Sequence, residues 1–392
     1  MPLLAQTATS PSETRLLNGL RVLVFKTQES SVTVRLRIHA GASFDMAGKE
    51  GTMRLLTEIL FPSEEFRNFI KEDFGRELVL RTNYDFIEIE SGAPPERIIS
   101  LLETLSARLI SPEINAETTG IAKRLVTTSE ATNQEVTINQ NIAGRFLGSH
   151  PHGRPINGST ESLSRIDFAD IIQARNRFLS PDNATLVISG DVDEGLMSRA
   201  IRRLFGPWTR ADLKPRWSFA APTPTTSSSD VIPYPGMEEG AFAFRLAVRN
   251  IPRTDSRFPA YLVARSILEG RIRNHFGNST VEDRGHRVQG VLILGASSND
   301  KSGANLLDDS LFGDVSGSEF ETAMSRAIPS YASIIDRWLD ADTYSLSTPN
   351  SESDLASKLT VDDVNGVIKA LKENPRLVLT FGGIKPVGES GQ

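Results

Sequence analysis

The same order of predicted elements occurs twice in this chain, and that repetition limits its possible folds more than any other feature. The first half begins with strands at residues 20–25 and 32–38, followed by a loop with glycines and a helix at residues 52–61. Apolar and polar residues alternate along residues 32–38, which is typical of an antiparallel strand with one buried face. Residues 241–248 alternate in the same way, and a helical pattern follows at residues 258–268.

The two halves also end alike. In the first half a predicted helix at residues 166–175 leads into a strand at residues 184–189. In the second half a helix at residues 359–371, which begins with a capping box at Thr360, leads into a strand at residues 377–381. This duplication predicts an α+β fold of two homologous subdomains, each with a mostly antiparallel sheet flanked by helices.

The predicted boundaries follow from a linker-like composition near the middle of the chain. Residues 227–229 are a serine run, and prolines and threonines precede it, as is typical of a linker. We therefore predict an N-terminal subdomain at residues 15–220, a linker at residues 221–231 and a C-terminal subdomain at residues 232–386. Residues 1–14 are expected to be disordered, either as a frayed terminus or as the stub of a trimmed secretory signal.

The composition excludes several classes of function. The chain has 392 residues, a net charge of −6 and no cysteine. The lack of cysteine excludes disulfides, thiolate metal sites and a cysteine nucleophile. Acidic character without runs of lysine and arginine argues against a nucleic-acid or membrane surface. No apolar run approaches the ~20 residues that span a bilayer.

Five segments carry a family resemblance through their order and spacing. They are residues 18–24, 41–45, 48–51, 150–155 and 178–184. Together they resemble the pitrilysin/insulinase family of zinc peptidases, which includes the mitochondrial processing peptidases and the core proteins of the cytochrome bc1 complex. The resemblance implies that the chain is one half of a clamshell, in which two such halves close around an extended peptide. A second subunit, identical or related, would then be required.

Peptidases of the resembled family carry an inverted His-x-x-Glu-His motif on a helix, where two histidines bind zinc and the glutamate activates the metal-bound water. In the matching segment Arg54 stands at the first histidine, Thr57 at the glutamate and Glu58 at the second histidine. Arginine stays protonated and cannot bind zinc, and Arg54 is instead spaced to form an ion pair with Glu58. We therefore predict a degenerate metal site without catalytic or metal-binding residues.

Two further features of the resembled family are missing. The downstream glutamate that supplies the third zinc ligand corresponds to Val126 or Thr127, and the nearest carboxylate, Glu130, lies about one turn away. The family also presents an arginine and a tyrosine that hold the substrate backbone, in a pattern like Arg-x-x-x-Gly-Leu-x-Tyr. When the pattern is anchored on Gly285, these positions are Val281 and Val288. We expect a degenerate substrate-orienting pair as well.

Two other regions allow alternatives. Residues 299–320 are rich in aspartate, serine and glycine, which predicts a solvated loop, with a gate or a partner-binding loop as the alternative. His150 and His152 could chelate a metal ion, but the prolines and glycine around them favour a turn.

The missing residues predict a pseudoenzyme: a non-catalytic metallopeptidase-like subunit that pairs with a zinc-bearing homologue to form a chamber for degrading or processing peptides. The alternatives are a structural, core-protein-like subunit of a larger assembly, and a zinc metalloendopeptidase with unconventional ligands. The expected cofactor is none, since any zinc would belong to the partner. The expected partners are that homologous zinc-containing subunit and an unstructured peptide, with no nucleic acid and no membrane span. A periplasmic or otherwise exported location is favoured.

Overall fold

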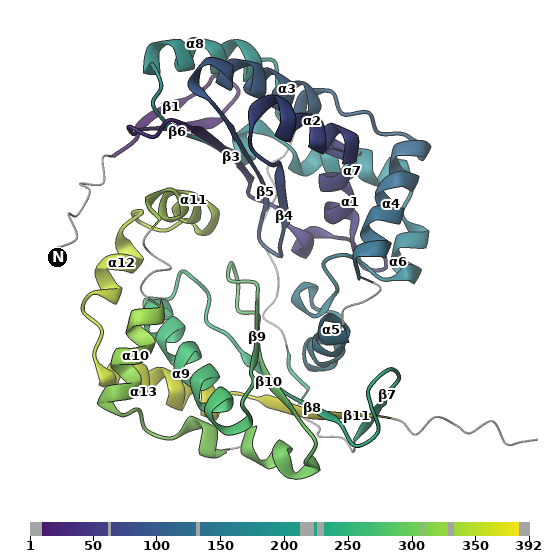
Figure 1. The fold of residues 1–392 in the computed structure, drawn as a ribbon, viewed down its shortest axis with the longest axis vertical. Coiled ribbons are helices and arrows are strands. Elements are labelled where there is room, and N and C mark those ends of the chain that lie inside the picture. The colour runs from purple at the N-terminus through teal and green to yellow at the C-terminus, as the bar shows by residue number, and fades with distance from the viewer. Residues whose placement is uncertain are drawn as a thin grey trace, which may run out of the picture. The chain divides into compact units, whose positions relative to one another are not determined.

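The chain folds into two compact units, each with one sheet and its own helices (Figure 1). The first unit comprises residues 1–132 and 155–218, and the second comprises residues 133–154 and 219–392. The structure, a computed structural model, describes residues 10–61, 64–130, 134–211, 223–225, 231–307, 309–327 and 333–383. The predicted α+β fold is confirmed.

The first unit contains a six-stranded sheet in the order β1-β2-β6-β3-β5-β4. Only the β2–β6 pair is parallel among its pairings. Its strands are β1 (Ser12–Arg15), β2 (Arg21–Lys26), β3 (Val32–Ile38), β4 (Val79–Thr82), β5 (Ile87–Ala93) and β6 (Ala184–Gly190). Its helices are α1 (Thr52–Leu60), α2 (Glu64–Phe74), α3 (Ile98–Ile110), α4 (Ala116–Glu130), α6 (Thr160–Arg165), α7 (Phe168–Phe178) and α8 (Glu194–Phe205), with the short 3-10 helices η1 (Ala42–Phe44), η2 (Pro95–Arg97) and η4 (Pro181–Asn183).

The second unit contains a five-stranded sheet in the order β7-β11-β8-β10-β9. Its strands are β7 (Ile232–Tyr234), β8 (Phe242–Arg249), β9 (Thr280–Arg284), β10 (Val291–Ser298) and β11 (Arg376–Gly383). Its helices are α5 (Gln134–Leu147), α9 (Phe258–Phe276), α10 (Gly317–Ala327), α11 (Ile334–Tyr344), α12 (Ser351–Ala356) and α13 (Val361–Glu373), with the 3-10 helices η3 (Pro151–Gly153), η5 (Lys301–Leu307) and η6 (Asp309–Phe312).

The two sheets repeat one topology, which confirms the duplication. The order β2-β6-β3-β5-β4 in the first unit corresponds to β7-β11-β8-β10-β9 in the second. The β2–β6 and β7–β11 pairs are both parallel, and the remaining pairs in each series are antiparallel. In both units a helix (α7 or α13) precedes the last strand, which then lies parallel to β2 in the first unit and to β7 in the second. Such a crossover is the usual route to a parallel neighbour.

The strand alternation predicted from sequence determines which face of each sheet is buried. Val34 and Leu36 of β3 belong to the core of the first unit, while Arg35 between them lies on the other face. Phe244 and Leu246 of β8 likewise belong to the core of the second unit. The predicted capping box of α13 is also confirmed: the Thr360 side chain accepts a hydrogen bond from the amide of Asp363.

The predicted N-terminal stub was too long. Residues 12–15 form β1 and pair with β2, so that Ser12 lies opposite Val24 and Arg15 opposite Arg21. Arg21 donates two hydrogen bonds to the Glu13 carboxylate, 2.9 Å each, across this pair. Pairing with β2 therefore orders residues 12–15, although this segment has few apolar residues of its own. Residues 1–9 lie outside the described residues.

The predicted N-terminal subdomain, residues 15–220, was wrong in one segment. Residues 133–154, which include α5, belong to the second unit. The reason is apolar packing: Ile142 and Phe146 of α5 form one cluster with Ala247 and Ile293 of the second sheet. Most of the predicted linker, residues 226–230 included, lies outside the described residues.

The expectation of a solvated loop at residues 299–320 was also wrong. This region contains η5, η6 and the beginning of α10. Leu307, Leu311, Phe312 and Val315 are buried in the core of the second unit. Apolar residues at helical spacing anchor a stretch whose average composition is polar.

Candidate functional site

The helix that would carry the zinc motif, α1, has a rigidly held start. The Asp45 carboxylate accepts hydrogen bonds from the backbone amides of Gly51 at 2.8 Å and Met53 at 2.9 Å. These bonds satisfy donors that the helix cannot satisfy itself. Gly51 has a φ of +95°, and a Cβ there would lie 2.7 Å from the backbone oxygen of Asn157. The positions of the motif residues along α1 are therefore fixed from its first turn.

Glu58 lies at the centre of this candidate site. The residue is 3% exposed, and its two carboxylate oxygens form ion pairs with different arginines, Arg54 of α1 and Arg67 of α2. Arg67 also donates hydrogen bonds to the backbone oxygen of Phe61, from Nη2 at 3.2 Å and from Nε at 3.3 Å. A guanidinium on each oxygen neutralises the carboxylate and occupies the lone pairs that a metal ion would need.

Thr57 is fully buried beside Glu58. Its hydroxyl lies 2.9 Å from the backbone oxygen of Met53 and 2.9 Å from the Oγ1 of Thr82 on β4. Back-bonding of a threonine to the preceding turn is common inside helices. The hydroxyl therefore ties α1 to the sheet.

The predicted third-ligand position is also apolar. Val126 of α4 is 1% exposed and belongs to the core of the first unit. The side chain of Glu130 lies outside the described ones. Arginine, threonine, a doubly paired glutamate and valine do not fit the zinc ion that the resemblance implies at this place. Among the described residues, no cluster of three or more histidine, aspartate or glutamate side chains could hold a metal.

A second buried carboxylate, which was not predicted from sequence, lies on the other face of the first sheet. Glu88 of β5 is 2% exposed and accepts hydrogen bonds from Arg35, Arg37 and Arg81 at 2.7 to 3.0 Å. Burial tends to raise the pKa of Glu88, but the guanidiniums of Arg37 and Arg35 outweigh it and lower the pKa below its usual value. The signal in the sequence was the set of charged residues at alternate positions of β3 and β5.

His150 and His152 contribute to a packed turn in the second unit. His152 is 1% exposed, and a Cβ placed on Gly285 would lie 2.2 Å from its ring. The Nδ1 of His150 accepts a hydrogen bond of 3.3 Å from the His152 amide at the start of η3. The predicted turn is confirmed, and Gly285 is the residue that lets the histidine ring lie so close to the backbone.

Val281 and Val288 lie at different places in the second unit. Val281 is part of β9 and packs against the core, whereas Val288 lies in the turn between β9 and β10. Both are partly buried. Between them in sequence, the Asp283 carboxylate accepts hydrogen bonds from the Tyr261 hydroxyl at 2.7 Å and the Asn250 amide at 2.8 Å.

The pKa of the Asp283 carboxylate is far below its ordinary value. Its side chain is 6% exposed, and burial would raise its pKa. The charges of His286 and Arg265, both 3.3 Å away, and the Asn250 hydrogen bond lower the pKa to about 2. The carboxylate is therefore an ionised anchor that holds the start of α9 to the β9–β10 turn.

The structure reveals a second place where the substrate-orienting pattern fits. Gly277 has a φ of +73° and ends α9, Arg273 lies four residues before it, and Thr280 begins β9 three residues after it. This placement keeps the arginine and the glycine of the resembled pattern, whereas Asn278 replaces its leucine and Thr280 replaces its tyrosine. The Nε of Arg273 donates to the Ser279 hydroxyl at 3.2 Å, and its Nη2 pairs with Glu269. The predicted helix ended at residue 268, whereas α9 continues to Phe276 and ends at Gly277, so the missed signal was a glycine that can end a longer helix.

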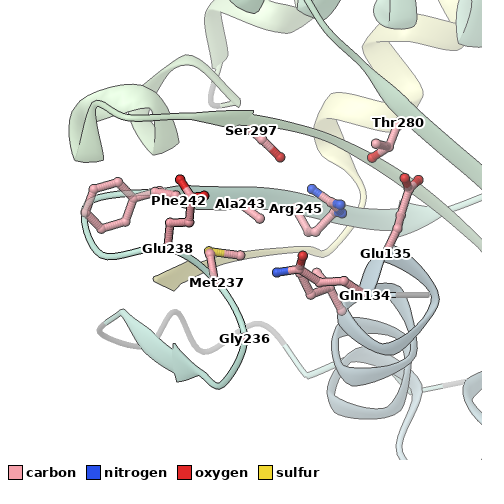
Figure 2. Close-up of a pocket in the computed structure, with 12 residues that line it drawn as sticks. Gln134, Glu135, Gly236, Met237, Glu238, Phe242, Ala243, Arg245, Thr280 and Ser297 are labelled. Atoms are coloured by element: carbon pink, nitrogen blue, oxygen red, sulfur yellow. The ribbon is translucent and has the colours of Figure 1, made fainter. Parts of the chain in front are cut away.

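The second unit also contains a cavity of about 590 Å³ (Figure 2). It lies between the first turn of α5, the turn after β7, and the face of the sheet formed by β8, β9 and β10. Thr280 lines it, so the second placement of the substrate-orienting pattern borders this cavity. The remaining lining residues are Gln134, Glu135, Ile138, Gly236, Met237, Glu238, Ala241, Phe242, Ala243, Arg245 and Ser297.

Comparison with known proteins agrees with this architecture. Residues 165–286 match the family described as Peptidase M16 inactive domain, and that segment joins the end of the first unit to the beginning of the second. Over this segment the chain is similar to the M16 peptidases. This is the pitrilysin and insulinase type that the sequence resembles, here with a degenerate zinc motif.

Two curated relatives of this M16-like chain are described as uncharacterized zinc proteases, one from Mycobacterium bovis and one from Mycobacterium tuberculosis. Each is 23% identical over 210 residues, which cover 51% of this chain and 48% of the relative. The match therefore spans about half the length of these proteins.

Solved structures share the fold of the M16-like chain over nearly its whole length. A peptidase M16 inactive domain from Pseudomonas fluorescens has a TM-score of 0.82 at 15% identity, covering 96% of this chain and 99% of that one. A protease from Helicobacter pylori has a TM-score of 0.78 at 14% identity, with coverage of 96% and 100%. The periplasmic protease PqqL from Escherichia coli has a TM-score of 0.72 at 14% identity, and the match covers 96% of this chain but 49% of PqqL.

The helices in the described part of the chain also bear on the expectation that no segment spans a membrane. None of them is both long enough and apolar enough to cross a membrane.

Proposed function

We propose that this M16-like chain is a non-catalytic half that pairs with a zinc-bearing homologue and completes a chamber for peptides. One observation carries the proposal: Glu58 of α1 is buried between Arg54 and Arg67, at the place where the resembled peptidases hold zinc. A protonated guanidinium repels a cation, and the carboxylate that could attract one is already neutralised. The chain would need no cofactor of its own, and any zinc would belong to the partner.

The proposed pairing rests on size and fold. The M16 inactive domain from Pseudomonas fluorescens is matched over 99% of its length, whereas PqqL is matched over 49%. One chain therefore corresponds in fold to about half of a longer relative, and a second copy of this fold from another subunit would supply the rest. By analogy with the periplasmic relative, we also propose an exported location.

Arg273 is the residue by which this half would contribute to substrate binding. It is 48% exposed in its side chain and follows the spacing of the substrate-orienting pattern. An exposed guanidinium can donate to peptide carbonyl oxygens in several directions. In the paired protein, Arg273→Ala should raise KM for peptide several-fold with a smaller change in kcat. The matched control is Arg326→Ala, which removes another arginine from the last turn of a helix, α10.

The decisive experiment measures zinc content and peptide hydrolysis for the purified chain, for a homologue with an intact His-x-x-Glu-His motif, and for their mixture. We expect no stoichiometric zinc and no turnover in the chain alone, and higher activity in the mixture than in the homologue alone. Stoichiometric zinc together with turnover in the chain alone would refute the proposal. A stable complex without any gain in activity would instead favour a purely structural subunit.

A further inference from the structure

Arg245 of β8 is a buried cation at the wall of the cavity in the second unit. The residue is 2% exposed, and its Nε donates to the Oδ1 of Asn139 on α5 at 2.7 Å. Its Nη1 donates to the backbone oxygens of Phe244 at 2.9 Å and Ala296 at 3.2 Å. All of these acceptors are neutral. Among the described residues, no carboxylate lies within ion-pair distance of Arg245, and its Nη2 has no hydrogen-bond partner.

A guanidinium buried in this way is energetically costly unless an anion approaches it. Burial lowers the pKa of Arg245, although the nearby charges of Glu135 and Glu282 act in the opposite direction. Glu282 reaches Arg245 only indirectly, because the Asn139 amide that accepts from Arg245 donates to Glu282 at 2.9 Å. The remaining donor, Nη2, is therefore available to an anionic group in the cavity.

The same cavity contains carboxylates that do not satisfy Arg245. Glu135, in the first turn of α5, and Glu238, in the turn after β7, both line the cavity and are exposed. Figure 2 shows them on opposite sides of Arg245. Neither forms an ion pair with the guanidinium within the described structure. A simple anion would be attracted by the Arg245 guanidinium but repelled by these carboxylates. The ligand should therefore carry one negatively charged group and one positively charged group.

The rest of the lining suits an aliphatic ligand with a peptide backbone. Phe242, Met237 and Ile138 supply apolar surface, and Thr280 and Ser297 supply hydroxyls that can donate or accept. A volume of about 590 Å³ lies within the usual range of ~300–1,000 Å³ for small-molecule sites. Inorganic phosphate would leave the apolar wall unused.

We propose that this cavity binds a short zwitterionic peptide of two or three residues, with its α-carboxylate on Arg245 and its ammonium group toward Glu135 or Glu238. All lining residues belong to the second unit, so the proposal does not depend on pairing with a catalytic subunit. It is consistent with a chain that acts beside a peptidase, because short peptides of this kind are the products of peptide hydrolysis.

Calorimetric titration of the full chain tests the proposal with three probes: the dipeptide Ala-Leu, its C-terminal amide and its N-acetyl form. Because each modification removes one charge, both modified probes should bind at least about tenfold more weakly than the free dipeptide. Equal binding of dipeptide and amide, or no binding of any probe at millimolar concentration, would overturn the proposal. Binding of inorganic phosphate as tight as that of the dipeptide would show a simple anion site and also overturn it.

Variants at the cavity wall separate binding from folding. The double variant Glu135→Gln and Glu238→Gln changes two exposed residues, and it should remove the difference between the dipeptide and its N-acetyl form. The control Glu239→Gln alters an adjacent exposed carboxylate that does not line the cavity, and it should bind all probes as the natural chain does. A double variant that keeps the full difference would show that the carboxylates do not contact the ligand.

Discussion

At the scale of single residues, Glu58 stands at the position of a zinc-binding histidine in the resembled peptidases and forms ion pairs with two arginines instead. Its carboxylate is buried and each oxygen contacts a different arginine, so three side chains from α1 and α2 neutralise one another in part. Arg54 and Arg67 are more exposed, at 20% and 32% of their side-chain surface. The cost of burying the carboxylate is therefore shared by two arginines that keep some contact with water.

This arrangement predicts a non-additive response to mutation. Arg54→Met and Arg67→Met should each destabilise the first unit by about 1 kcal/mol, since one partner remains. The double variant should lose about 3 kcal/mol or more, because the carboxylate is then buried without a cation. Urea unfolding followed by circular dichroism measures these values. Adding Glu58→Leu to the double variant should recover much of the loss, and strictly additive single effects would contradict this account.

Asp283 predicts a specific dependence of stability on pH. Its pKa of about 2 in the folded chain lies below the unfolded value of about 3.8. A lowered carboxyl pKa stabilises the fold above the unfolded pKa, and that contribution disappears as the pH falls from about 4 to 2. The difference in unfolding free energy between the natural chain and Asp283→Asn should therefore shrink by about 2 kcal/mol from pH 5 to pH 2.

The control for Asp283 is Asp314→Asn, which changes an exposed carboxylate in the same unit. This variant measures the effect of removing a carboxylate that does not belong to the Asp283 network. A pH-independent difference for Asp283→Asn would show that the network of Tyr261, Asn250, Arg265 and His286 does not hold the carboxylate in its ionised form.

At the scale of elements, α5 is assigned by its packing rather than by its place in the chain. It lies in sequence within the first half, between α4 and α6, yet its apolar face covers the second sheet. Ile142 and Phe146 are fully buried in that contact, while Val136 on another face is 42% exposed. The helix thereby also provides one wall of the cavity around Arg245.

Removing the largest side chain that α5 contributes to this contact should destabilise the second unit alone. Phe146→Ala should cost about 4 kcal/mol, because it leaves a cavity between α5 and the sheet. Amide hydrogen exchange should accelerate in β8, β10 and β11 but stay unchanged in β2 and β3. Val136→Ala is the matched control on the exposed face and should have little effect. Faster exchange in β2 and β3 instead would place α5 with the first unit.

At the scale of the whole molecule, the chain carries separate cores in its two units. One apolar cluster contains Leu102 of α3 and the buried face of the first sheet, and another contains Leu268 of α9 and the corresponding face of the second. Each unit buries its own helices against its own sheet, so each can gain or lose stability by itself.

Matched core truncations test this independence. Leu102→Ala and Leu268→Ala each remove a fully buried leucine, and each should cost about 3 kcal/mol in its own unit. Hydrogen exchange should show the first effect in β2, β3 and β6 and the second in β8, β10 and β11. The double variant should show the sum of the two effects, and a large coupling between the sites would contradict separate cores.

Several features of the fold could be predicted from sequence because they depend on neighbours in the chain. The alternation at residues 32–38 gave β3 with its observed bounds, and Thr360 with Asp363 gave the capping box of α13. The pairing of Arg54 with Glu58 followed from their spacing on one helix. These interactions span four residues or fewer, so local geometry alone specifies them.

Other features depended on contacts between distant segments. The sequence of α5 predicts an apolar face but does not identify which sheet covers it. The second cation on Glu58 comes from Arg67 on another helix, and Thr82, which contacts Thr57, comes from a strand. Spacing along one helix cannot predict such partners.

The sequence alone therefore determined that no pair of histidines stands four residues apart on α1 and that the α+β unit occurs twice, since both are patterns along the chain. Only the tertiary structure decided that Arg67 is the second partner of Glu58, where α5 packs, and that Arg245 lies buried at a cavity wall. The physical reason is that burial and charge pairing depend on contacts between segments that are distant in the sequence. These contacts exist only after each sheet and its helices have formed.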